Sequence, residues 1–198
     1  MSLNILGGLI KGHSLFVPPD NLTRPTAAPL KRRVFDSCQN LSGMRFIDLC
    51  AGSGSIGIEA WSRGAEHVIL VEHNKKVMTF LTKNLKNLEE KFNEELSDRP
   101  IELAADLSEK WIDKKWQESY NSEKNIIYLD PPYEKIKVYE HVLKFLAAGE
   151  FSGELWLEGC KQKGKDHSHW TAMLPGVPFK VYQQGTSFIA RFIFGQGD

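Results

Sequence analysis

Residues 44–60 read MRFIDLCAGSGSIGIEA and carry the strongest indication of the fold. An apolar run through Phe46 and Ile47 ends at Asp48, a glycine-rich turn follows, and a helical pattern begins at Ser55. Open α/β sheets bind ligands at the carboxyl ends of their strands, where glycines allow the backbone to approach the ligand closely. The stretch therefore predicts a ligand-binding turn after the first strand of such a sheet.

Four more apolar runs downstream predict further strands, and most of the five are dense in Ile, Leu and Val, as expected of strands buried on both faces. The five runs are MRFIDLC (44–50), HVILVE (67–72), IELAA (101–105), NIIYLD (125–130) and GELWLEG (153–159). Helical periodicity covers residues 55–63, 74–88 and 136–146. This alternation predicts a mostly parallel sheet with helices on both faces.

The C-terminal part predicts an antiparallel hairpin, with strands over residues 177–182 and 187–194 joined by turn residues 183–186. Five parallel strands followed by a hairpin predict a seven-stranded, mostly parallel, Rossmann-like α/β sheet, the variant of the doubly wound fold that is typical of class I S-adenosylmethionine-dependent methyltransferases. We assign residues 44–198 to this catalytic domain. Residues 1–43 are expected to form an N-terminal extension with a small hairpin, a loop and one helix over residues 30–41.

Composition favours one compact domain, because the 198 residues are 41% hydrophobic and 25% charged. No apolar run is long enough to span a bilayer, so we expect a cytoplasmic protein that does not bind membranes. Three widely spaced cysteines argue against disulfides and zinc, and we expect no metal. The net charge is zero, but residues 1–45 carry a net charge of +4 and the remainder −4.

The glycine turn predicts a cofactor site, although such a turn can also merely join a strand to a helix. Its glycines match the G-x-G-x-x-G spacing of dinucleotide sites. A carboxylate before the turn would repel a pyrophosphate, whereas it suits a cationic cofactor without phosphates, such as S-adenosylmethionine. We expect S-adenosylmethionine to bind at Asp48, Ala51, Gly52, Ser53 and Gly54.

Two more acidic residues stand at predicted strand ends. Glu72 ends the second strand, about 20 residues after the glycine turn, where a carboxylate can accept hydrogen bonds from ribose hydroxyls. Asp106 follows the third strand and is expected to bind the adenine amino group, although it is equally suited to cap a helix.

The motif Asp130-Pro131-Pro132-Tyr133 follows the fourth strand directly. Its prolines stiffen the backbone and remove N–H donors, which keeps nearby carbonyl oxygens available as acceptors. An exocyclic base amine can donate one N–H to the Asp130 carboxylate and the other to the Pro131 carbonyl, so that the nitrogen lone pair points at the cofactor methyl. Tyr133 offers a face for base stacking. We expect these four residues to be catalytic, the alternative being a Pro-Pro turn capped by Asp130.

These residues resemble the amino-methyltransferases of nucleic acids, and more closely the RsmD-type 16S ribosomal RNA guanine-N2 methyltransferases. The resemblance runs from Leu3 to about Phe194. It is carried by NILGG (4–8), Arg24-Pro25-Thr26, FIDLCAGSGSIGIEAWSRGA (46–65), the strand end at Glu72, the motif at 130–133 and LWLEG (155–159). It implies methyl transfer from S-adenosylmethionine to the N2 amine of a guanine, with S-adenosylhomocysteine as product.

The resemblance also implies that 16S ribosomal RNA or the small-subunit particle is the partner. Since the extension carries the excess positive charge, we expect RNA contacts there, at Arg24, Thr26, Lys31, Arg32 and Arg33, although these can also form a solvated helix face. We expect a monomer. Two alternatives remain at this point: an amino-methyltransferase acting on adenine or cytosine of DNA or other RNA, and a catalytically inactive RNA-binding relative.

Overall fold

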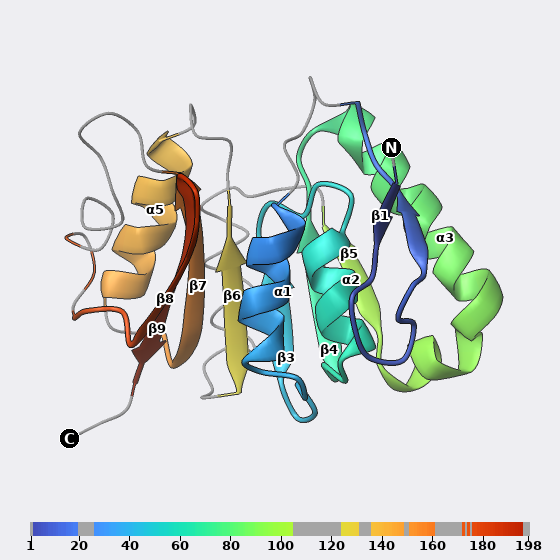
Figure 1. Cartoon of the computed structure of the whole chain (residues 1–198), viewed down its shortest axis with the longest axis horizontal. Helices are drawn as coiled ribbons and strands as arrows, with labels where there is room; N and C mark the ends of the chain where they lie inside the picture. The colour runs from blue at the N-terminus through green and yellow to red at the C-terminus, as the bar shows by residue number, and fades with distance from the viewer. Residues whose placement is uncertain are drawn as a thin grey trace.

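The structure is a computed structural model that describes residues 2–19, 26–104, 124–130, 136–148, 151–160, 172, 174 and 176–195. At its centre lies a seven-stranded sheet in the order β5-β4-β3-β6-β7-β9-β8 (Figure 1). The parallel strands are β3 (Arg45–Asp48), β4 (His67–Val71), β5 (Ile101–Ala104), β6 (Asn125–Leu129) and β7 (Gly153–Cys160). The five predicted parallel strands are confirmed.

The predicted C-terminal hairpin is also confirmed. Strand β9 (Ser187–Phe194) pairs antiparallel with both β7 and β8 (Lys180–Gln184), so it lies between them. The expected four-residue connection is wrong, because β8 continues to Gln184 and only residues 185–186 form the turn. Gly185 has φ 59°, which suits a two-residue hairpin turn.

Side chains of the central strands alternate between two apolar clusters, one on each face of the sheet. On β6, Ile126 and Tyr128 belong to one cluster, and Ile127 and Leu129 to the other. Because both faces are buried, residues 126–129 are all apolar or aromatic, and the sequence of this strand shows no period of two.

Three helices pack on the first face: α1 (Ala28–Asp36), α2 (Ser55–Ser62) and α3 (Lys75–Asp98). Helix α5 (Ile136–Ala147) packs on the second. Helix α3 runs ten residues beyond the predicted end at Leu88, with a kink at Phe92, whose ring packs edge-on against Trp61. Among the residues that the structure describes, no helix is long and apolar enough to cross a membrane.

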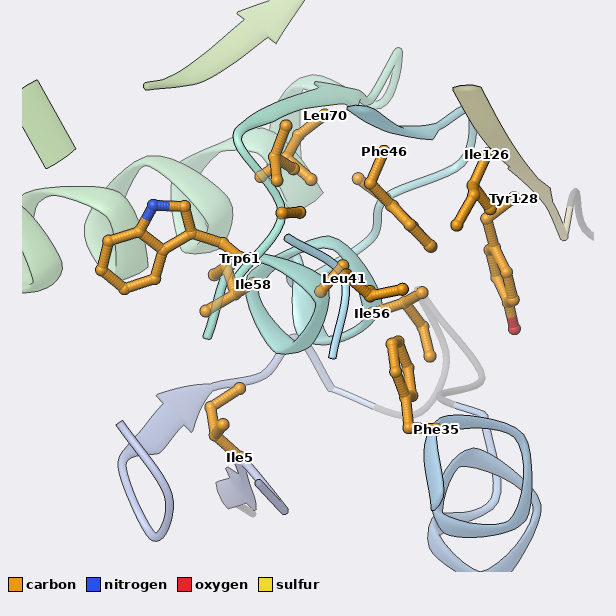
Figure 2. Packing of buried hydrophobic residues seen from close by; sticks show 14 of the residues in the cluster. Ile5, Phe35, Leu41, Phe46, Ile56, Ile58, Trp61, Leu70, Ile126 and Tyr128 are labelled. Atoms are coloured by element: carbon orange, nitrogen blue, oxygen red, sulfur yellow. The ribbon is translucent and has the colours of Figure 1, made fainter. Parts of the chain in front are cut away.

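The extension forms a hairpin of β1 (Ser2–Asn4) and β2 (Ser14–Phe16), as predicted, followed by α1. The helix expected over 30–41 is shorter, ending at Asp36. The hairpin and α1 contribute Ile5 and Phe35 to the same apolar cluster as α2, and Figure 2 shows both side chains directed toward that helix. The hairpin backbone is also fixed to α2, since Leu9 donates to the Ser62 carbonyl at 2.7 Å.

Candidate active site

The glycine turn joins β3 to α2 in a conformation that requires glycine. Gly52 and Gly54 have φ of 58° and 83°, in the left-handed region that other residues rarely adopt. Gly57 has a different role, because a Cβ there would lie 2.2 Å from Leu70 of β4. Gly52 and Gly54 therefore shape the turn, and Gly57 lets α2 pack closely on the sheet. The match to the G-x-G-x-x-G spacing is thus explained without a bound dinucleotide.

The turn lies where chain connections leave the sheet in opposite directions. Strand β3 is flanked by β4 and β6, and the turn is hydrogen-bonded to both, from Ala51 N–H to Val71 O and from Leu49 N–H to Tyr128 O. Such a switch point is the usual ligand site of open α/β sheets.

Glu72 follows β4 and holds the turn directly. Its Oε2 accepts from Gly52 N–H at 3.0 Å and its Oε1 from Asn74 N–H at 2.7 Å. A carboxylate has about four lone-pair positions, so each oxygen keeps capacity for a further donor such as a ribose hydroxyl. The predicted acidic residue and glycine turn thus come together.

Asp48 lies beneath the turn, and only 2% of its surface is exposed. Its carboxylate accepts from Gly57 N–H at 3.2 Å. Burial, aided by the negative charges of Glu72 and Glu158, raises the pKa of Asp48 to about 7. Buried and neighbouring acidic groups of this kind favour a cation, because a positive charge would relieve their mutual repulsion.

Asp130 is half-buried and follows β6 directly. Since Leu129 is paired with Leu157 in the parallel register, Asp130 and Glu158 come next on adjacent strands. Glu72, the glycine turn and Asp130 therefore stand at the ends of three neighbouring strands, β4, β3 and β6. Pro131, Pro132, Tyr133 and Asp106 lie outside the described residues, and their roles stay predictions.

A buried hydrogen-bonded group beside Asp130 was not foreseen as part of the site. Thr26 Oγ1 donates to Glu158 Oε2 at 2.8 Å, and the Tyr128 hydroxyl donates to the same oxygen. Burial, followed by the charges of Glu158 and Asp130, raises the pKa of Tyr128 well above its ordinary value. Thr26 is only 9% exposed, so its predicted RNA contact is not retained. Its hydroxyl instead ties the extension to the carboxyl-terminal part of β7.

Asn84 is a second residue at the turn whose contacts the sequence did not predict. It is 1% exposed on α3, and its amide bonds Phe16 N–H, Phe16 O and Ser53 O at 2.8, 2.9 and 2.9 Å. One side chain thus joins the extension to the glycine turn. A signal was present, because Asn84 interrupts the apolar stripe that Val77, Leu81 and Leu88 form on the helix.

The predicted RNA-binding residues are placed unequally. Lys31 is 4% exposed, and its Nζ lies 2.7 Å from Ser55 O and 3.1 Å from Glu59 Oε2. An ammonium group enclosed in this way cannot reach a phosphate, so the expectation for Lys31 is corrected. Arg32 and Arg33 are exposed, but Arg33 donates to the Gln183 carbonyl at 2.6 Å. Arg24 lies outside the described residues.

Within the described parts of the chain, no group of three or more His, Cys, Asp or Glu side chains is arranged to hold a metal ion. The acidic groups at the strand ends are instead bonded to backbone N–H groups and hydroxyls.

The strand order, the single antiparallel strand inserted near one edge and the glycine turn at the switch point define a class I methyltransferase fold. The chain belongs to the family described as Conserved hypothetical protein 95, whose model matches residues 3–166.

Two named relatives are similar in sequence. A Bacillus subtilis protein named "Putative rRNA methyltransferase YlbH" is 34% identical over 137 residues, which cover 69% of this chain and 70% of the relative. "Ribosomal RNA small subunit methyltransferase D" of Buchnera aphidicola is 32% identical over 130 residues, or 65% of this chain and 62% of the relative. The matched part thus spans less than two thirds of the Buchnera protein.

Solved structures share the fold. The "Putative methyltransferase yhhF" of Escherichia coli superposes with a TM-score of 0.73 at 20% identity, covering 98% of both chains. An RNA methyltransferase of Salinibacter ruber in complex with S-adenosyl-L-homocysteine has a TM-score of 0.55 at 18% identity, covering 88% of this chain and 96% of that one. At these identities the likeness concerns the fold alone.

Proposed function

We propose that this protein transfers a methyl group from S-adenosylmethionine to the exocyclic N2 amine of a guanine in 16S ribosomal RNA. The observation that carries the proposal is the arrangement at three adjacent strand ends, where Glu72 and the glycine turn lie beside Asp130. The names of the two relatives support ribosomal RNA of the small subunit as the substrate. The protein acts as a monomer in the cytoplasm, on free RNA or on the small-subunit particle.

The cofactor half of the site consists of the turn at residues 51–54, Glu72 and Asp48. Glu72 already fixes the Gly52 amide and accepts the ribose hydroxyls with its remaining lone pairs. Asp48 and Glu72 lower the energy of a positive charge above the turn. When bound, S-adenosylmethionine supplies a methyl group on a positively charged sulfur.

The amine half of the site is the motif at 130–133. Asp130 accepts one N–H of the guanine amine and the Pro131 carbonyl accepts the other, which orients the nitrogen lone pair and stabilises charge that develops on nitrogen. Tyr133 stacks on the base, which has to be unpaired or flipped out to enter. Alignment of the two reactants supplies the catalysis, and no metal or covalent intermediate takes part.

The test is methylation of in vitro transcribed 16S rRNA, free or assembled into small-subunit particles, followed by mass analysis of the nucleosides. N2-methylguanosine is the expected product. Methylated adenine or cytosine would show a different amino-methyltransferase, and S-adenosylmethionine binding without any product would show an inactive relative.

Two variants test the roles of the amine half and the cofactor half of the site separately. Asp130→Ala is expected to lower turnover by about 10²–10³ with unchanged cofactor affinity, because the lost acceptor acts mainly in the transition state. Asp98→Ala, which removes an exposed carboxylate at the end of α3, is the matched control. Glu72→Ala is expected to weaken cofactor binding in calorimetry by about 1.5–3 kcal/mol.

A further inference from the structure

The first half of α3 presents positive charge only. Residues 73–88 contain four lysines and no acidic residue, whereas residues 89–98 contain five acidic residues and one lysine. The four lysines, Lys75, Lys76, Lys83 and Lys86, are all exposed. The zero net charge of the whole chain conceals this separation within one helix.

The positions of these lysines destabilise the helix. Lys75 and Lys76 stand in the first turn, where the helix dipole favours negative side chains, and that turn contains no acidic residue. At 3.6 residues per turn, Lys83 lies two turns after Lys76 on the same face, and Lys86 follows one turn later. A row of like charges that weakens its own helix is expected where another molecule uses it.

An exposed aromatic ring completes this surface. Phe16, at the end of β2, is 40% exposed, and Lys83 Nζ lies 3.6 Å from the centre of its ring. Figure 1 shows the hairpin alongside α3. Lys83 thus lies over one face of this ring. An exposed ring among lysines is suited to a nucleic acid strand, because the lysines bind phosphates and a ring face that Lys83 does not cover can stack on an unpaired base.

The surface is fixed to the cofactor turn. Asn84, next to Lys83, bonds both backbone polar groups of Phe16 and also Ser53 O. A strand lying over Phe16 is therefore separated from the turn by one buried side chain. The neighbouring positions, exposed Thr79 and half-buried Thr82, are polar, which fits a nucleic acid better than the apolar centre of a protein interface.

We propose that Phe16, Lys75, Lys76, Lys83 and Lys86, here called the α3 lysine surface, bind a single-stranded segment of the RNA substrate beside the cofactor turn. This inference rests on the proposed function, since it names the surface that the substrate of that reaction uses. Phosphates lie along the lysines, and one unstacked base lies on Phe16.

The test compares two triple variants with the same loss of charge. Lys76→Ala/Lys83→Ala/Lys86→Ala removes three lysines of the surface. Lys124→Ala/Lys144→Ala/Lys180→Ala removes three exposed lysines at the opposite, amino-terminal end of the parallel strands. The probes are transcribed 16S rRNA and a 20-nucleotide single-stranded RNA, titrated at several salt concentrations.

The α3 variant is expected to bind both RNAs more weakly, with a slope of log affinity against log salt that is shallower by about 2, or about 0.7 per lost phosphate contact. Its cofactor affinity should equal that of wild type. Unchanged RNA affinity and slope, or an equal loss in the control variant, overturns the proposal. Guanine methylation by the wild-type protein is measured in parallel, so that failure of the proposed surface can be distinguished from failure of the proposed function. If the wild type is active and the α3 variant binds RNA normally, the surface is refuted and the function is not.

Phe16 provides an independent test, because its side chain is exposed and its backbone holds the bonds to Asn84. Phe16→Leu removes the aromatic face but keeps an apolar side chain. It is expected to weaken RNA binding by about 5- to 150-fold, the range for stacking of one base, with an unchanged salt slope. Wild-type affinity in Phe16→Leu shows that no base stacks there and overturns that part of the proposal.

Discussion

Two stretches of the chain, residues 24–33 and 75–86, each contain four basic residues, yet the structure uses them differently. In the first, Lys31 is enclosed by Glu59 and Ser55, and Arg33 is bonded to the Gln183 carbonyl. In the second, all four lysines are exposed. Local charge in a sequence therefore does not reveal whether a cation stabilises the fold or faces a partner.

The two stretches also share a structural role, because each includes or adjoins a side chain bonded to the glycine turn or to the helix residue that follows it. Lys31 donates to the Ser55 carbonyl from the side of α1, and Asn84, next to Lys83, donates to the Ser53 carbonyl from α3. Substitutions in the two stretches should therefore distinguish the effect of interior hydrogen bonds from the effect of surface charge.

The largest effect is expected from Lys31→Met, which removes the ammonium but keeps most of its volume. Glu59 is fully buried and would keep Arg63 as a partner at 2.8 Å. We expect the free energy of unfolding, from urea titration, to fall by about 3 kcal/mol, the lower end of the range for breaking a buried ion pair. Arg32→Met, the exposed neighbour, should change it by less than about 0.5 kcal/mol. Equal stability of the two variants would contradict the difference between the stretches.

Asn84→Ala should have the next largest effect, because it leaves the Phe16 backbone groups and Ser53 O without their partner. We expect a loss of about 1–3 kcal/mol in unfolding free energy and faster hydrogen exchange at the Phe16 amide. Asn87→Ala, three residues along the same helix, is the control and should leave both quantities unchanged. Slow exchange at Phe16 in Asn84→Ala would mean that the hairpin is held elsewhere.

The affinity for S-adenosylmethionine should depend on pH because of Asp48, which lies beneath the glycine turn. Its pKa of about 7 belongs to the protein without cofactor, and a cationic cofactor favours the ionised carboxylate. Affinity for S-adenosylmethionine should therefore rise as the pH rises through 7, by about tenfold between pH 6 and pH 8. Calorimetry at both pH values checks this, and Asp48→Asn should remove the rise. The same rise in Asp48→Asn would assign the titration to another group.

The smallest effect is expected from Arg32→Ala/Arg33→Ala in the extension. Because Arg33 already has a carbonyl partner, at most one phosphate contact is lost, and the salt slope of RNA binding should change by about 0.7. A change as large as that of the α3 triple variant would place the RNA on the extension after all.

The sequence allowed the sheet and the glycine turn to be predicted because their signals are local. Apolar runs marked the strands, and Gly52 and Gly54 stand where the backbone needs positive φ. The interior polar bonds could not be predicted in the same way. Thr26 and Glu158 are 132 residues apart and Lys31 and Glu59 are 28 apart, so no short pattern joins them. The end of α3 was missed because its second half is mostly polar.

The position of β9 between β7 and β8 bears on how the protein is made. Strand β8 leaves the ribosome first, but its pairing partner is β9, so it cannot join the sheet until β9 has been synthesised. Until then the edge of β7, which β9 pairs with from Gly153 to Cys160, is exposed and can recruit strands of other chains. A nascent chain stalled before residue 187 is therefore expected to aggregate more readily than the full chain.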